Sequence, residues 1–311
     1  MSGSPARVLV GAYAASPAHT RWDPLLEAEL LAALFALPSV RGFELPWLGA
    51  VHPHDPRWLL DHVPRGAQVA LTPLPWVMRR SAQSPAYGLA SVDPEGRAAA
   101  VADLRRVNDD VGLLAGESDA EPALVLLHSA PRRRADASAL ARSLDELARW
   151  DWKGARLVVE HCDAVRPGRA FEKGFLPIDE ELAVIGRADG DVGLWMNWGR
   201  SAIELRDSDA VTAQIRDASA TGRLVGLSFS GASSHDGPYG PAWTDSHPPI
   251  RSTDPSSHSV LDDAHVAAAV AAAPGVPWLG VKVARRPDDV TAAEVAATVR
   301  RNLDIVRGAS R

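Results

Sequence analysis

A glutamate at the end of a short apolar run gives the sharpest chemical signal in this chain. Glu160 closes the run RLVVE, so its carboxylate is expected at the edge of a buried segment. A buried carboxylate is unfavourable unless it is paired with a cation, bound to a metal or shifted in pKa. Glu160 is therefore a candidate catalytic acid or base. A structural ion pair with a basic residue such as Lys282 is the alternative.

Two histidines extend this candidate chemistry. His128 ends the run LVLLH, where a neutral imidazole can bind a metal, accept a proton or clamp a substrate. A core histidine hydrogen-bonded to the backbone is the competing interpretation. His247 follows Asp245 by two residues, and in an extended loop such residues point to the same side. The Asp245 carboxylate and the His247 imidazole could therefore coordinate one cation.

The elements that must position these residues are eight apolar runs, each followed by a turn cluster and an amphipathic stretch. This alternation predicts a (β/α)₈ TIM barrel, formed by the 311 residues as a single domain. No G-x-G-x-x-G follows the first run, so neither a doubly wound sheet nor a nucleotide cofactor is expected. The runs are Arg7–Tyr13, Gly42–Pro46, Gln68–Pro73, Ala123–Ser129, Arg156–His161, Val192–Asn197, Leu224–Ser230 and Trp278–Ala284.

A barrel gathers the carboxyl ends of its strands at one mouth, so polar residues that end the runs should meet in one pocket. The longest non-helical insertion, residues 231–259, follows the seventh run and is the expected active-site loop. Tryptophans near this mouth could stack on the C–H faces of a sugar, although most of the ten must fill space between helices. The candidate substrate-binding residues are Tyr13, Glu44, Trp47, His161, Asn197, Ser228, His235 and Trp243.

Composition limits the partners. The net charge of −6 leaves no basic footprint for nucleic acid, and Arg132–Arg134 is a solvated helix start or a contact for a substrate phosphate. The alanine-rich run His265–Ala273 is too short to cross a membrane. The single cysteine, Cys162, excludes an intrachain disulfide and fits a reducing cytoplasm.

The strand endings VLLH, LVVEH and VGLWMN, with the later DSHPP, resemble the xylose isomerase-like barrels. This superfamily contains sugar isomerases, epimerases and endonuclease IV. Glu44 in GFELPW also resembles the glutamate that ends the second strand of these barrels. The resemblance covers almost the whole chain, as a little-characterised branch, and implies proton abstraction beside a sugar carbonyl.

This chain departs from the family pattern at three ligand positions. Asn197 stands where the family has Asp, Ser228 where it has His, and Lys282 where it has Glu. An ammonium group at a cation site opposes a two- or three-metal centre, and with it DNA cleavage. The resemblance still leaves room for one divalent metal, Mn²⁺, Zn²⁺ or Mg²⁺, held by His128, Glu160, Asp245 and His247. In the metal-free alternative, Glu160 and Lys282 form an acid–base pair.

The expected function is isomerisation or epimerisation of a sugar or keto-sugar through an enediol-type intermediate. Glu160 would be the base or a metal ligand, His128 a ligand or clamp, and Lys282 a stabiliser of oxyanion charge. A 3-keto-sugar lyase or hydratase uses the same abstraction step and is the closest alternative. A non-catalytic sugar-binding protein is the other. The expected partner is a small-molecule sugar, with no nucleic acid or membrane, and a homo-oligomer is left open.

Overall fold

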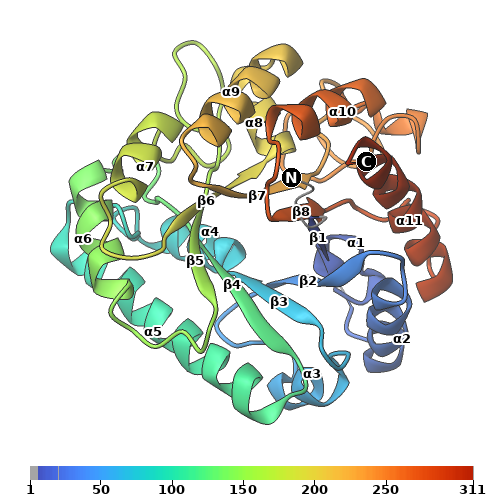
Figure 1. Cartoon of the computed structure of the whole chain (residues 1–311), viewed down its shortest axis with the longest axis horizontal. Helices are drawn as coiled ribbons and strands as arrows, with labels where there is room; N and C mark the ends of the chain where they lie inside the picture. The colour runs from blue at the N-terminus through green and yellow to red at the C-terminus, as the bar shows by residue number, and fades with distance from the viewer. Residues whose placement is uncertain (1–5, 20, 311) are drawn as a thin grey trace. The chain divides into compact units, whose positions relative to one another are not determined.

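The computed structural model describes residues 6–19 and 21–310. Within these residues, eight parallel strands follow one another in chain order around a closed barrel (Figure 1). Each strand begins within two residues of the start of an expected apolar run, so the predicted barrel is confirmed. The first run, Arg7–Tyr13, is a strand only as far as Val10, because a helix already begins at Ala12. The strands are β1 (Arg7–Val10), β2 (Val40–Pro46), β3 (Gln68–Thr72), β4 (Glu121–Leu127), β5 (Arg156–Glu160), β6 (Gly193–Asn197), β7 (Leu224–Phe229) and β8 (Trp278–Val281).

The chain divides into two compact units. The terminal unit consists of Met1–Glu44 and Met196–Arg311, and the mid-chain unit of Leu45–Trp195. In the terminal unit β1 pairs with both β2 and β8, and β8 also pairs with β7. In the mid-chain unit β4 pairs with both β3 and β5.

Helices follow the strands, and aspartates begin many of them. Asp23, Asp55 and Asp93 each accept backbone N–H hydrogen bonds at a helix start and precede a proline, whose fixed φ suits the first helical turn. The helices are α1 (Ala12–Ala15), α2 (Pro24–Phe35), α3 (Pro56–His62), α4 (Leu74–Gln83), α5 (Pro94–Glu117), α6 (Ala137–Leu147), α7 (Ile178–Ile185), α8 (Trp198–Leu205), α9 (Ser208–Ala220), α10 (Asp263–Ala272) and α11 (Ala292–Ala309).

The expected active-site loop, residues 231–259, lies in the terminal unit. Its regular structure is one 3₁₀ turn, η2 (Pro255–Ser257), and internal hydrogen bonds hold the rest. The Gly231 N–H donates to the Pro248 carbonyl at 2.9 Å, and the Tyr239 hydroxyl donates to Asp254 at 2.7 Å. The loop is therefore a hydrogen-bonded segment with its own internal cross-links.

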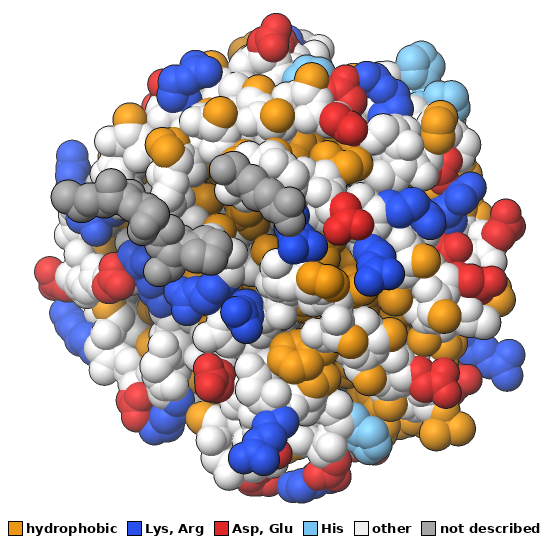
Figure 2. All heavy atoms as spheres, turned by 45° about the vertical axis from the view of Figure 1, so that its right-hand side comes forward, with side chains coloured by type: hydrophobic (Ala, Val, Ile, Leu, Met, Phe, Trp, Pro, Cys, Tyr) orange, Lys and Arg blue, Asp and Glu red, His pale blue; other side chains and the backbone are white. Residues whose placement is uncertain are grey.

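One face of the molecule carries charges of both signs. Figure 2 shows basic and acidic side chains interspersed with apolar ones over the face it presents. Among the helices of residues 6–19 and 21–310, none combines the length and apolar character needed to cross a membrane.

Candidate functional site

A histidine and a glutamate meet at the carboxyl ends of two neighbouring strands of the mid-chain unit. The register of β4 and β5 pairs Leu127 with Val159, so the next residues, His128 and Glu160, emerge side by side. His128 Nε2 lies 2.9 Å from Glu160 Oε2, and neither side chain is exposed. The structure thus brings together the two strongest candidates from the sequence.

The His128–Glu160 contact is suited to proton transfer. Burial opposes an isolated carboxylate, and a hydrogen bond to an imidazole compensates part of that cost. A proton located between the two groups can be exchanged within the pair, and the hydrogen bond also fixes the direction of the carboxylate. The arrangement supports a general acid–base role for Glu160, with His128 as the residue that orients it.

His161 belongs to a second buried pair in the same unit. Successive strand residues point to opposite faces, so His161 turns away from the direction of Glu160. His161 Nδ1 lies 2.7 Å from Glu181 Oε2 of α7, and the Ser129 hydroxyl donates to Glu181 Oε1 at 2.5 Å. The structure therefore places His161, an expected substrate-binding residue, against the helix that follows its strand.

Sequence reasoning missed Glu181, although a signal was present. Ile178, Glu181 and Ile185 recur at helical spacing, so a carboxylate interrupts the stripe that faces the core. Glu181 is fully buried. A charged residue on such a stripe indicates a buried polar partner.

In the terminal unit Lys282 pairs with Glu44. Lys282 follows β8, Glu44 lies on β2, and β1 separates the two strands. Lys282 Nζ is 2.6 Å from Glu44 Oε1, and the two side chains are 1% and 3% exposed. Glu44, expected as a substrate-binding residue, is therefore a counter-ion of Lys282.

Two residues around β1 shape the surroundings of this ammonium group. A Cβ at Gly11 would lie 2.7 Å from Lys282 Cγ, so the glycine makes room for the lysine side chain. Tyr13, on α1, has its ring centroid 4.9 Å from Lys282 Nζ. Burial raises the pKa of Tyr13 although Lys282 opposes the shift, so the phenol keeps its proton at neutral pH. Its hydroxyl is thus a hydrogen-bond donor.

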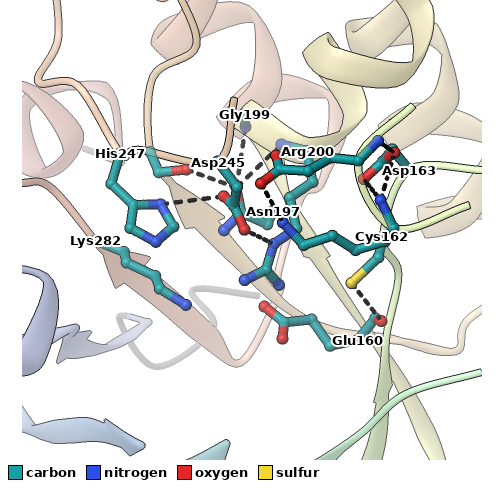
Figure 3. Close-up of polar contacts among 12 residues, drawn as sticks. Glu160, Cys162, Asp163, Asn197, Gly199, Arg200, Asp245, His247 and Lys282 are labelled. Carbon is teal, nitrogen blue, oxygen red and sulfur yellow. Dashed lines mark hydrogen bonds and ion pairs between the residues drawn. The ribbon is translucent and has the colours of Figure 1, made fainter. Parts of the chain in front are cut away.

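Asp245 lies between a guanidinium and an imidazole (Figure 3). Arg200 Nε donates to Asp245 Oδ2 at 3.0 Å, and the two side chains are 1% and 8% exposed. His247 Nδ1 is 3.3 Å from Asp245 Oδ1. His247 has a φ of 56°, in the left-handed region that costs a non-glycine residue energy. Sequence reasoning expected the Asp245–His247 pair and missed Arg200.

Asn197 fixes the helix that carries Arg200. Its Oδ1 accepts hydrogen bonds from the Gly199 N–H at 3.0 Å and the Arg200 N–H at 3.4 Å, which caps α8. The Ser230 hydroxyl donates to the same oxygen at 2.8 Å. The structure thus uses Asn197, an expected substrate-binding residue, as a helix cap.

The remaining candidates occupy varied surroundings. Trp47 is buried, donates from Nε1 to Asp110 at 2.6 Å and packs edge-on against Trp76. The Ser228 hydroxyl donates to the Met196 carbonyl at 3.4 Å. In the long loop the His235 ring is 6.0 Å from that of His258, and the Arg206 guanidinium lies 4.1 Å from the Trp243 ring centroid.

The four expected metal ligands form two pairs, one in each unit: His128 with Glu160, and Asp245 with His247. Over the described part of the chain, no group of three or more His, Cys, Asp or Glu residues is arranged to hold a metal ion. The guanidinium at Asp245 also adds a positive charge where a cation would bind. The residues at Asp245 therefore do not fit a divalent metal.

Comparison with known proteins gives the family. Residues 9–297 match a family described as a domain of unknown function, DUF4862. The chain belongs to this family. This DUF4862 protein is also 37% identical over 270 residues to the uncharacterised protein STM3670 of Salmonella typhimurium strain LT2, an alignment that covers 85% of this chain and 84% of that protein.

Solved structures give the fold of the DUF4862 protein. L-ribulose 3-epimerase superposes with a TM-score of 0.60 at 18% identity, over 98% of this chain and 95% of the epimerase. A xylose isomerase-like TIM barrel/4-hydroxyphenylpyruvate dioxygenase fusion protein superposes with a TM-score of 0.59 at 16% identity, over 96% of this chain but only 42% of the fusion protein. These likenesses show the fold and confirm the expected xylose isomerase-like barrel in a little-characterised branch.

Proposed function

We propose that this DUF4862 protein is a sugar or keto-sugar isomerase or epimerase that removes a proton from the carbon beside a carbonyl. The observation that carries the proposal is the buried His128–Glu160 contact at the carboxyl ends of β4 and β5. In a (β/α)₈ barrel this is the end of the strands where catalytic residues lie. The fold shared with L-ribulose 3-epimerase supports the substrate class.

Glu160 is the proposed base. Its carboxylate takes the proton, and the C–H electron pair forms the C=C bond of an enediol while the carbonyl oxygen gains negative charge. Delivery of a proton to the opposite face of the same carbon gives the epimer. Delivery of a proton to the former carbonyl carbon gives the isomer, when the hydroxyl on the deprotonated carbon passes its own proton to the oxyanion and becomes the new carbonyl. His128 orients the carboxylate through the 2.9 Å contact.

Lys282 is the proposed stabiliser of the oxyanion, because a fixed cation in a dry site favours the charge that develops on oxygen. Tyr13 is the proposed hydrogen-bond donor to a sugar hydroxyl, since its phenol stays protonated. Ser228, His235 and Trp243 remain proposed substrate-binding residues. A small sugar is the proposed partner, and the cytoplasm, where one cysteine stays reduced, is the proposed location.

Deuterium exchange tests the proposal without knowledge of the product. Purified protein is incubated in D₂O with a panel of aldoses, ketoses and 3-keto-sugars, and proton NMR follows loss of the signal beside the carbonyl. We expect exchange with at least one sugar, slowed about 10²- to 10⁴-fold by Glu160→Gln. Glu121→Gln, at the exposed start of β4, is the matched control and should exchange at the wild-type rate.

The alternatives give different results. A non-catalytic sugar-binding protein would bind a sugar by calorimetry and exchange no proton. A lyase or hydratase would exchange the proton and also lose water or a leaving group from the sugar. Unchanged exchange in Glu160→Gln would remove Glu160 from the mechanism.

A further inference from the structure

In the terminal unit, the buried cations of Arg200 and Lys282 each contact a carboxylate. Arg200 contacts Asp245 at 3.0 Å, and Lys282 contacts Glu44 at 2.6 Å. All four side chains are at most 8% exposed. Removal of an ion pair from water is costly, and the attraction between the partners often does not repay it. Two such pairs in one unit therefore need an explanation beyond stability.

The cations of both pairs act on one tyrosine of the same unit. Lys282 Nζ lies 4.9 Å from the ring centroid of Tyr13, and Lys282 and Arg200 both oppose the rise that burial causes in the pKa of this phenol. Tyr13 lies on α1 just after β1, Lys282 just after β8, and Arg200 in the first turn of α8 after β6. These positions follow the carboxyl ends of strands, where barrel enzymes bind substrates.

Close packing of the backbone places Arg200. A Cβ at Gly199 would lie 2.6 Å from Ser230 Oγ and 2.7 Å from the Gly231 carbonyl oxygen, so the first turn of α8 sits directly against the segment after β7. The Asn197 cap holds the same turn. Asp245 reaches the guanidinium from the long loop. The location of Arg200 is therefore fixed by three chain segments.

We propose that Arg200 occupies, at Asp245, the position that a divalent cation would take, and that Arg200 and Lys282 bind the substrate oxygens in a metal-independent reaction. A guanidinium carries five N–H donors in a planar fork. Such a fork matches two neighbouring oxygens, and an enediolate presents two. During proton abstraction the electron pair moves into the C=C bond, and these cations hold the charge on oxygen.

The claim about the metal is tested without any substrate. The full chain is stripped with EDTA, desalted and titrated with Mn²⁺, while EPR measures the free ion. We expect no stoichiometric binding by the wild type. Arg200→Met should gain at least tenfold in Mn²⁺ affinity because Asp245 loses its counter-ion, and Asp245→Asn in that background should remove the gain. Arg216→Met, on the exposed face of α9, makes the same net charge change elsewhere and should gain nothing.

Two results overturn the claim about the metal. One is a wild type that binds one Mn²⁺ and loses it in Asp245→Asn; the other is a folded Arg200→Met variant that gains no affinity. Circular dichroism melting establishes whether Arg200→Met folds. If Arg200→Met does not fold, Arg200→Lys replaces it, because lysine keeps the positive charge on a shorter side chain, and this variant should bind no Mn²⁺. The comparison of Mn²⁺ binding by the wild type and by Asp245→Asn then tests the claim about the metal.

The claim about the substrate rests on the proposed sugar chemistry and uses the deuterium exchange assay. Wild-type exchange should persist in EDTA, and Arg200→Lys should lower kcat about tenfold or more because an ammonium cannot form a planar fork. Exchange that requires added Mn²⁺ overturns metal independence. If no sugar exchanges deuterium, the proposed function fails while the Mn²⁺ titration still decides the role of Arg200.

Discussion

His128 Nε2 and Glu160 Oε2 lie 2.9 Å apart, and both side chains are fully buried. Loss of one partner removes a buried hydrogen bond, so we expect His128→Ala to lower the free energy of unfolding by about 1–3 kcal/mol. The double variant with Glu160→Ala should be less destabilised than the sum of the singles, with a coupling of about 0.5–3 kcal/mol. Urea unfolding of the four proteins measures the cycle. Additive effects would show that the contact contributes nothing.

Gly11 should control the position of Lys282. Gly11→Ala places a Cβ 2.7 Å from Lys282 Cγ and 3.3 Å from Lys282 Cα, so the side chain must shift. Overpacking of this kind costs about 1–3 kcal/mol, and deuterium exchange should fall with it. Gly112→Ala on α5 is the control: its Cβ meets nothing within 4 Å, and it should stabilise the chain by about 0.5–1 kcal/mol. Equal urea midpoints for the two variants would contradict the prediction.

The strands were predictable because each is an apolar run bounded by turn residues, a local property of the sequence. The His128–Glu160 contact was predictable in part, since consecutive strands of a barrel are neighbours and these residues end two of them. Many of the described helices begin after a capping aspartate, which is likewise a local feature of the sequence.

Arg200 could not be found in this way. It becomes a site residue only because α8 begins at once after β6, capped by a residue of the strand itself, so the sequence contains no separate start signal. Asn197 therefore suggested a substrate ligand at a strand end. The partners of Asp245 and Lys282 depend on how loops and neighbouring strands bring distant residues together, which spacing along the chain does not record.

Asp254 should make the long loop sensitive to acid. Burial alone would raise the pKa of this carboxyl, but hydrogen bonds from Ser256 and Tyr239 outweigh it, and the pKa is lowered. A carboxyl whose pKa is lower in the folded state stabilises the fold at pH values above its pKa in the unfolded state, about 3.9. This contribution is lost as the pH falls through the pKa of the folded state. Asp254→Asn should therefore be less stable than the wild type at pH 7, and the difference should shrink below about pH 4.

Urea unfolding from pH 7 to pH 2.5 measures this difference. Tyr239→Phe removes the 2.7 Å hydrogen bond to Asp254. It should reduce the contribution of Asp254 to the free energy of unfolding at pH 7, and a dependence of that contribution on pH should remain. A stability difference between wild type and Asp254→Asn that stays constant across the range would exclude Asp254 as its source.

The Lys282–Glu44 pair should separate stability from catalysis. Lys282→Met leaves a buried carboxylate without this counter-ion and should cost about 3–5 kcal/mol, whereas the double variant Glu44→Met with Lys282→Met removes both charges and should regain most of that stability. Arg57→Met breaks an exposed pair with Asp61 and should change little. Deuterium exchange should fall about 10²- to 10³-fold in the single and the double Lys282 variants alike, because the cation that holds the oxyanion is absent from both. Recovery of exchange along with stability in the double variant would make the pair purely structural.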